Sequence, residues 1–308
     1  MEVFESKRIL VAGATGYLGK HVVQAFKARG CWVRVLTRNS DRLFEPGPFT
    51  APALTSDDVD EVFVGEITKP ETLSGLLDDI DIVFSCVGIS RQRDGLSFDD
   101  VDYRCNQTLI DLAVAAGVER FVYVSMQGAE NLGQLAITQA HEKVVDALRN
   151  STLVHRIIRP CGYFSDMGAI YEMARKGRVY LVGQGENYVN PIHGRDLAEV
   201  CVQTAEGDVV EVVAGGPDTM TQRQAAELAF EVAGRPAKTT VIPLWAARFL
   251  VRLLRLLSKQ YGDLVDFIVT AGEFDSVGPK RGTRTLRSYF EALRDGDFDP
   301  PGSAQKRD

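Results

Sequence analysis

The sequence predicts an α/β fold, a doubly wound parallel sheet followed by a small C-terminal α+β lobe. Two observations lead to this prediction. Short apolar segments alternate with helical patterns up to about residue 165, an order typical of a parallel sheet with helices on both faces. Beyond that residue the alternation breaks down, and short strands and helices follow one another irregularly.

The first strand is predicted at residues 9–12, and a glycine-rich turn follows it directly. Gly13, Gly16 and Gly19 are spaced as GxxGxxG, and apolar residues recur at helical spacing from Tyr17 onward. Glycines at these places allow a tight turn, close approach of the backbone to a diphosphate, and tight packing of the helix. Because the first N–H groups of the helix face the phosphates, this segment predicts a dinucleotide site. The alternative is a tight turn that binds nothing.

The second strand is predicted at residues 31–37, and Arg38 follows it, where the adenosine ribose lies in such folds. An acidic residue there would accept a hydrogen bond from the 2′-hydroxyl of NAD, whereas an arginine suits the 2′-phosphate of NADP. Arg38, with Arg42 nearby, therefore favours NADP(H) over NAD(H). The alternative is an arginine exposed on a surface loop.

Two further strands are predicted at residues 61–65 and 81–86, with a helix at 70–77 between them. Glu66 follows the first of these strands and either lies near the adenine or favours the start of the helix. Gly88 lies at the carboxyl end of the strand at 81–86, where a small residue leaves room for the nicotinamide ribose.

A polar loop, a helix and a strand are predicted next. The loop at 89–98 lies at the same edge of the sheet, and its Arg91 and Arg93 either face an anionic substrate or lie on the surface. The helix is predicted at 98–116, ended by a glycine, and the strand at 121–125.

Three segments resemble one known family. GATGYLG at 13–19 resembles the nucleotide loop of the extended and atypical short-chain dehydrogenases/reductases. The run at 101–125 resembles their central section, and RPCGYF at 159–164 resembles their RPxxF segment. The sequence is identified as a member of the NmrA-like, NAD(P)-binding branch of that superfamily.

The resemblance implies a division into domains. A Rossmann-type NAD(P)-binding domain is expected over residues 1–165, with strands returning near 188–214. A C-terminal substrate lobe is expected over most of 166–295, and a polar, disordered tail over 296–308.

The resemblance also implies catalytic positions. Ser125 ends the fifth strand, where these enzymes place a hydroxyl near the reacting carbonyl. Most of them carry YxxxK, in which the tyrosine donates a proton and the lysine holds the ribose. Lys143, on a helix predicted at 138–148, matches the lysine, but Gln139 occupies the tyrosine position and cannot act as that acid. His141 replaces the donor only if its helix face turns inward, and it does not share a face with Lys143.

The sixth strand is predicted at 154–159, and the RPxxF segment after it passes over the nicotinamide end in the family. Tyr163 is the alternative proton donor by position, or else a packing residue. The candidate catalytic residues are Lys143, Ser125 and Tyr163. The residues expected around the cofactor are Gly13, Ala14, Thr15, Gly16, Tyr17, Leu18, Gly19, Arg38, Glu66, Ile67, Val87, Gly88, Lys143, Pro160, Gly162 and Phe164.

The second half of the chain is predicted to be less regular. Residues 178–182 and 188–192 are expected to form a hairpin-like pair of strands. Asp196 is expected to cap the next helix, and His193 either lines the substrate pocket or is a structural histidine. The remaining predicted elements are a helix at 167–176, a strand at 209–214, a helix at 221–233 and a short strand at 239–242.

An arginine- and leucine-rich helix is predicted at residues 244–259. Its Arg248, Arg252, Arg255 and Lys259 recur at intervals of four, three and four residues and form one basic stripe. Such a helix lies on an anionic membrane surface, makes a protein contact, or packs as a lid with its apolar side toward a core. Because arginines interrupt the apolar run, a membrane-spanning helix is not expected.

Composition excludes some classes of protein. The 308 residues carry a formal net charge of −7, which argues against a nucleic-acid-binding protein. The five cysteines are scattered without a CxxC pair, so no metal site or disulfide framework is expected. These features, with an N-terminus unlike a signal peptide, predict a cytoplasmic protein, at most peripheral to a membrane, that is a monomer or a dimer.

Two functions remain open. The first is an NADPH-dependent reductase of a small quinone-, enone- or vinyl-type substrate, because such acceptors suit a site without the usual tyrosine. The second is a non-catalytic NADP-binding sensor or complex-assembly subunit that uses the basic helix as a docking surface.

Overall fold

The computed structural model describes residues 4–47, 49–88 and 95–296. Its centre is a seven-stranded sheet in the order β3-β2-β1-β4-β5-β6-β9, with every neighbouring pair parallel. The predicted doubly wound parallel sheet is therefore confirmed. Its strands are β1 Arg8–Ala12, β2 Trp32–Thr37, β3 Glu61–Val64, β4 Ile82–Ser85, β5 Arg120–Val124, β6 Val154–Pro160 and β9 Glu211–Ala214.

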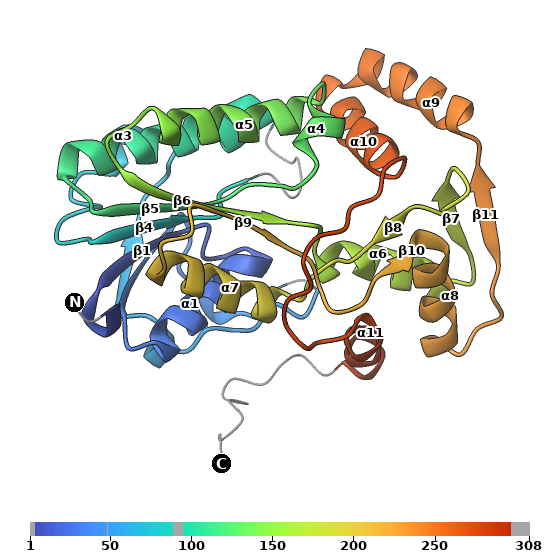
Figure 1. Ribbon diagram of the computed structural model, residues 1–308, viewed down its shortest axis with the longest axis horizontal. Helices are drawn as coiled ribbons and strands as arrows, with labels where there is room; N and C mark the ends of the chain where they lie inside the picture. Colours follow the sequence, from blue (N-terminus) through green and yellow to red (C-terminus); the bar gives the residue numbers. More distant parts are fainter. Residues whose placement is uncertain (1–3, 48, 89–94, 297–308) are drawn as a thin grey trace.

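Helices cover both faces of this sheet (Figure 1). One layer contains α1 (Tyr17–Ala28) and α7 (Gly194–Glu206), and the other contains α3 (Asn106–Ala116) and α5 (Ala136–Arg149). Because side chains alternate along a strand, Ile9 and Val11 of β1 enter the first layer, whereas Leu10 and Ala12 enter the second. Burial on both faces explains why the strands are mostly apolar rather than alternating between apolar and polar residues.

The prediction of a helix at residues 70–77 is wrong. The structure has a single 3₁₀ turn, Pro70–Thr72, followed by irregular turns. Gly75 and Asp79 adopt φ angles of +78° and +58°, a left-handed conformation that a right-handed helix does not accommodate. The turns still bury Leu73 against the sheet, so the apolar pattern is satisfied without a helix.

The helix predicted at 98–116 begins differently from the expectation. Its first part, Asp99–Cys105, is a π-helical stretch that runs directly into α3. Gly117 ends α3 in the left-handed conformation, as predicted.

The lobe beyond the sheet has its own core between three helices, α6 (Phe164–Arg175), α8 (Gln222–Val232) and α11 (Leu286–Asp295). The prediction that residues 178–182 and 188–192 form a hairpin-like pair is wrong. Instead, β7 (Val179–Val182) pairs in parallel with β11 (Thr239–Ile242), and β8 (Tyr188–Val189) pairs antiparallel with β10 (Met220–Thr221). Adjacent strands in sequence therefore find distant partners, which local periodicity does not reveal.

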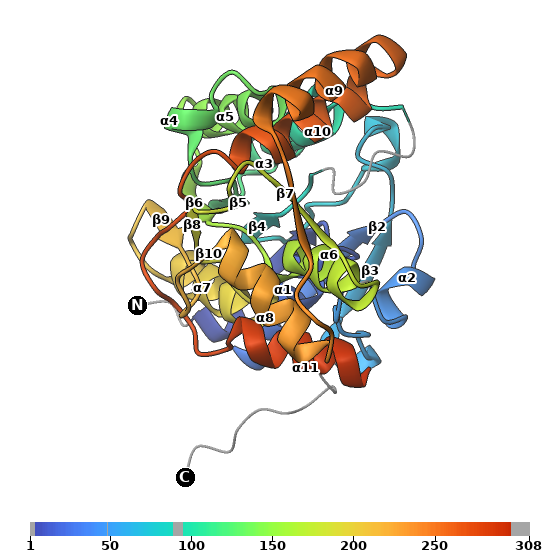
Figure 2. The ribbon, with the colours of Figure 1, turned by 90° about the vertical axis from the view of Figure 1, so that its right-hand side faces the viewer.

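Two helices, α9 (Leu244–Leu257) and α10 (Lys259–Ala271), lie at the outer edge of the lobe (Figures 1 and 2). Helix α10 contacts α5 and the short helix α4 (Ala129–Leu132), and α9 lies on α10. Two sequence predictions fall outside the described residues: the loop arginines Arg91 and Arg93, and all of the predicted tail at 296–308 except Gly296. Gly296 itself ends α11 with a left-handed φ of +68°.

The segment between α10 and α11 runs back along the junction of sheet and lobe (Figure 1). Asn190 is fully buried there, donating to Gly278 O at 2.9 Å and accepting from Gly278 N at 3.0 Å. Asp196 accepts from the backbone N–H groups of Thr283 and Arg284, both at 2.9 Å, and pairs with the Arg284 guanidinium. These buried polar contacts fix the last segment to α7.

The prediction that Asp196 caps α7 is wrong. The N-cap is His193, whose Nδ1 accepts from Arg195 N at 3.1 Å. Asp196 lies in the first turn of the helix, and its carboxylate bonds a segment almost ninety residues later in the chain.

Replacing Asp196 by asparagine removes the charge that its three partners share. We expect Asp196→Asn to lower the free energy of unfolding by about 2–3 kcal/mol, because charge-assisted hydrogen bonds at a buried carboxylate are lost. Urea unfolding followed by circular dichroism measures the change. Asp146→Asn is the control, since that side chain is 70% exposed and lies 3.9 Å from Arg149; equal stability of the two variants would contradict the assignment.

Candidate functional site

The carboxyl ends of the parallel strands meet at one edge of the sheet, and the glycine-rich turn lies at its centre. Gly13 follows β1 with a φ of +92°, and Gly16 is the N-cap of α1, with its N–H donating to Gly13 O at 3.0 Å. The first turn of α1 contains no acidic residue. Its leading N–H groups and positive dipole end therefore suit a diphosphate.

The turn has no space for side chains at two of its glycines. A Cβ on Gly19 would lie 2.1 Å from Gly13 O, and a Cβ on Gly13 would lie 2.9 Å from Cys86 O. The first contact holds α1 against the turn, and the second holds the turn against the end of β4. This close packing, together with the absence of a side-chain cap on α1, fits a turn that holds the diphosphate of a dinucleotide.

A lysine that the sequence analysis did not single out fixes the neighbouring segment. Lys20 on α1 is fully buried and donates through Nζ to Leu43 O at 3.0 Å and to Glu45 O. Burial, with a smaller contribution from Arg42, lowers the pKa of Lys20 to about 8. The short helix α2 (Asp41–Phe44) is thereby tied to α1. A lysine within an amphipathic helix gives no sequence signal of this role.

Arg38 and Glu66 follow the adjacent strands β2 and β3 and lie together at the edge. Arg38 Nη1 is 3.9 Å from Glu66 Oε1, and 59% of the Arg38 side chain is exposed. Lys69 bonds Glu66 at 2.7 Å and is the main cause of the lowered pKa of that carboxyl. The edge beside the turn thus presents two cations, on either side of a single carboxylate.

The end of β4 is held by a buried amide. Asn106 accepts from Ser85 Oγ at 2.5 Å and donates to Val87 O at 3.1 Å. Gly88 follows and is exposed, and a Cβ there would lie 2.8 Å from Asp102 Oδ1. The Asp102 carboxylate therefore lies next to the space that the sequence analysis assigned to the nicotinamide ribose.

The structure turns His141, not Lys143, toward this part of the sheet. His141 Nδ1 lies 2.6 Å from the hydroxyl of Tyr123 on β5, and His141 Nε2 lies 3.5 Å from Asp102 Oδ1. Only 12% of the His141 side chain is exposed. Burial, and secondarily Arg159, lowers the His141 pKa to about 4, so the imidazole is neutral at pH 7. Asp102, His141 and Tyr123 form what we call the histidine cluster.

Lys143 points away from the histidine cluster. Its Nζ bonds Asp99 at 2.6 Å and lies 5.1 Å from the centroid of the Tyr103 ring, with 53% of the side chain exposed. A cavity of about 230 Å³ between α5 and α10 is lined by Lys143 and Gln139, the two positions that matched YxxxK, and by Lys259. The prediction that His141 and Lys143 lie on different faces of the helix is confirmed. His141 lies on the face that packs against the sheet.

Ser125 is enclosed at the end of β5. It is 3% exposed, and its Oγ accepts from Arg159 Nη1 at 3.4 Å. Arg159 also bonds Glu142 at 2.5 Å and Glu211 at 2.6 Å, so it joins α5, β6 and β9. The hydroxyl predicted to face a substrate is part of this buried network.

The two aromatic residues after β6 differ in their surroundings. Tyr163 packs edge-on against Tyr17, with ring centroids 6.4 Å apart, and burial raises its pKa well above the ordinary value. Phe164 is 1% exposed and belongs to the core of the lobe, where it contacts His193 and Tyr289. Tyr163 therefore lies beside the glycine-rich turn, whereas Phe164 anchors the lobe, and His193 packs beside it.

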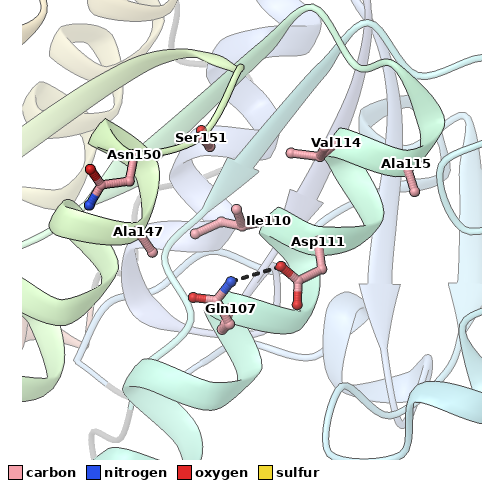
Figure 3. Close-up of a pocket in the computed structure, with 8 residues that line it drawn as sticks. All are labelled: Gln107, Ile110, Asp111, Val114, Ala115, Ala147, Asn150 and Ser151. Carbon is pink, nitrogen blue, oxygen red and sulfur yellow. Dashed lines mark hydrogen bonds between the residues drawn. The ribbon is translucent and has the colours of Figure 1, made fainter.

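A second hollow lies away from this edge. Figure 3 shows a shallow groove of about 370 Å³ between α3 and α5, where Gln107 donates to Asp111 at 2.8 Å. Asn150 and Ser151 line it just before β6 begins. The groove is thus at the amino ends of the strands, opposite the end at which open α/β sheets bind ligands.

Residues 13–208 match a family model described as NAD(P)H-binding. The chain belongs to this family. The predicted assignment to the atypical short-chain dehydrogenases/reductases is confirmed by this match together with the fold.

The curated relatives of this chain share only about a quarter of the aligned residues with it. The photosystem II assembly factor Ycf39 of Trieres chinensis is 26% identical over 258 residues, which cover 82% of this chain and 76% of the relative. The chloroplastic divinyl chlorophyllide a 8-vinyl-reductase of Zea mays is 25% identical over 285 residues, covering 88% and 69%.

Solved structures share the fold. The NADPH-dependent quinone oxidoreductase QOR2 of Escherichia coli, in complex with NADPH, superposes with a TM-score of 0.72 at 19% identity, covering 93% of this chain and 99% of that one. A nucleoside-diphosphate-sugar epimerase of Staphylococcus aureus superposes with a TM-score of 0.71 at 15% identity, covering 92% and 99%. These likenesses establish the architecture of this NAD(P)H-binding protein.

The contact between Gly19 and Gly13 leads to a prediction for cofactor binding. We expect Gly19→Ala to weaken binding of the nicotinamide cofactor at least roughly tenfold, because the new Cβ displaces α1 from the turn that holds the diphosphate. Fluorescence titration with NADPH measures it. Gly272→Ala is the control, since its Cβ would meet its nearest neighbours at an ordinary 3.4 Å. Unchanged affinity in Gly19→Ala would contradict the placement.

The histidine cluster leads to a pH prediction. His141 titrates at about 4 when folded and near 6.5 when unfolded. Below pH 6.5 the unfolded chain therefore gains a proton that the folded chain does not. The free energy of unfolding should therefore decrease as the pH is lowered from about 6.5 to 4. His141 should account for roughly 3 kcal/mol of that decrease.

The measurement is urea unfolding of wild type and His141→Gln across that range. The difference between the two pH profiles isolates the contribution of His141 from that of the carboxyl groups. His155→Gln, which changes the same residue type on β6, is the matched control. If His141→Gln retained the wild-type slope, the buried neutral imidazole would be refuted.

Proposed function

We propose that this protein is an NADPH-dependent reductase of a small quinone-, enone- or vinyl-type substrate. The observation that carries the proposal is the histidine cluster beneath Gly88, at the edge of the sheet where ligands bind in open α/β folds. Burying a carboxylate beside a neutral imidazole costs stability, and such costly arrangements cluster at functional sites.

The cofactor would lie across the carboxyl edge of the sheet. The glycine-rich turn would hold the diphosphate, and Arg38 the 2′-phosphate, with which a guanidinium makes paired hydrogen bonds. Gly88 leaves space for the nicotinamide ribose, and Asp102 and His141 offer polar atoms beneath it. His141 thus takes the role that the sequence analysis assigned to Lys143. When bound, NADPH supplies a hydride to the substrate.

The chain's own residues orient the reactants in this proposal. Because the Asp102 carboxylate can only accept, we infer that His141 carries its proton on Nε2, toward Asp102, and accepts from the Tyr123 hydroxyl at Nδ1. Tyr163, beside the turn and just after β6, is the phenol that we assign to the nicotinamide end. A conjugated substrate spreads the negative charge that forms on hydride addition, so it depends less on a strong acid than a simple carbonyl does. This fits an α5 helix with Gln139 at the usual tyrosine position.

A second function is favoured by a different observation. Several large apolar side chains of α9 are exposed, with Trp245 at 75% and Leu256 at 84%, which is typical of a surface that contacts another component. One relative is named an assembly factor and another a vinyl reductase. A non-catalytic NADP-binding subunit that assembles a complex is therefore the alternative to the reductase.

Parallel fluorescence titrations with NADPH and NADH test the cofactor assignment. We expect tighter binding of NADPH, and Arg38→Glu should weaken NADPH binding by roughly 100-fold, because one paired cation is lost and a like charge is added. NADH binding should change little. Arg175→Glu on α6 is the control, because Arg175 is also 59% exposed but lies in the lobe. Equal affinity of wild type for both cofactors would remove Arg38 as the discriminator.

Turnover distinguishes the two functions. Consumption of NADPH would be followed with a short-chain quinone, a cyclic enone and a vinyl-substituted tetrapyrrole. Reduction of any of them supports the reductase. Tight NADPH binding without reduction of any favours the assembly subunit, and binding of neither cofactor would overturn both.

A further inference from the structure

Helix α9 is apolar on two opposite sides. Ala247 and Val251 are buried against Val269 of α10 and Ile242 of β11. One side of the helix therefore packs on the lobe, as the sequence analysis allowed. The other side carries large apolar side chains that remain exposed: Trp245, Phe249, Leu250, Leu253, Leu256 and Leu257.

The exposed side chains form a continuous stripe. Trp245, Phe249, Leu253 and Leu256 recur at intervals of four, four and three residues, which places them on one face of a helix. Their exposed fractions are 75, 64, 46 and 84%. Soluble monomers rarely expose a contiguous apolar patch larger than a few hundred Å². We call this face the outer face of α9.

Basic residues border the outer face on one flank. Arg248 bonds Glu273 at 2.7 Å, and Arg255 bonds Asp266 at 2.8 Å, so these two arginines tie α9 to the following segment. Arg252 lies between them, and within the described part of the chain no ion pair involves it or Lys259. Helix α9 contains no acidic residue, although the whole chain carries a net charge of −7.

The shape of this region limits what can cover it. Both views place α9 at the outer boundary of the molecule, resting on α10 (Figures 1 and 2). It is a single ridge of 14 residues, about 21 Å long at 1.5 Å per residue. A ridge cannot enclose a partner helix as a groove does, but it can sink lengthwise into a lipid interface.

We propose that the outer face of α9 docks the protein on an anionic lipid bilayer. The Trp, Phe and Leu side chains would enter the boundary between headgroups and acyl chains, and Arg252 would contact the anionic headgroups. The helix lies in the plane of the interface, and no helix of the described chain has the length and apolar character needed to cross a membrane. The docking does not depend on the proposed reductase activity.

Vesicle binding tests this proposal directly. The full chain would be mixed with vesicles of phosphatidylcholine alone and with vesicles that also contain phosphatidylglycerol, and then floated on a density gradient. We expect co-flotation with the anionic vesicles and much weaker binding to the neutral ones. Phe249→Glu/Leu256→Glu should reduce binding at least roughly tenfold. Val209→Glu, at a residue 60% exposed away from α9, should leave it unchanged.

The basic flank has its own readout. Arg252→Glu should weaken binding to anionic vesicles by roughly fivefold or more, since each basic residue near such a surface contributes to attachment. It should not alter binding to neutral vesicles. In a Trp32→Phe background, Trp245 is the remaining tryptophan, and its emission should shift to the blue on binding.

Two outcomes would overturn the proposal. If the wild-type chain does not float with anionic vesicles but is a dimer by light scattering, and Phe249→Glu/Leu256→Glu makes it monomeric, the outer face is a contact between copies. If it neither floats nor dimerises, the face belongs to a contact with another protein.

Discussion

The close approach of α1 to the turn after β1 is the constraint on which the rest of the site depends. Gly19 lies so near Gly13 O that no side chain fits between them, and Gly13 lies against Cys86 at the end of β4. Three elements therefore meet at these two glycines. This contact aims the start of α1 across the sheet edge and sets the distance from the turn to Gly88.

Buried polar groups complete what the glycines begin. Lys20 ties α2 to α1, Asn106 holds the end of β4, and Arg159 joins α5 to β6 and β9. Each of these groups bonds partners from other elements, so each fixes an orientation that apolar packing leaves open. The lobe is attached in the same way, through Asn190 and Asp196. Hydrogen bonds thus fix the orientation of the elements around the carboxyl edge of the sheet, which apolar packing alone would not specify.

The two ends of the molecule differ in how they treat charge. Around Ser125 and Asp102, ionisable groups are buried, and burial lowers the pKa of His141 to about 4. On α9, arginines stay at the surface beside exposed leucines and aromatic residues. The first arrangement suits a site where a ligand replaces water, and the second suits a surface that meets a lipid or another protein.

The sequence alone determined the parallel sheet and the glycine-rich turn, because strand periodicity and glycine spacing are local and have few structural solutions. It could not determine which face of α5 turns inward, and the structure packs His141 against Tyr123 while Lys143 stays half exposed. It also paired 178–182 with 188–192, although each finds a partner far along the chain. Helix phase and long-range pairing depend on which surfaces become buried together, and that is decided only when the whole chain packs.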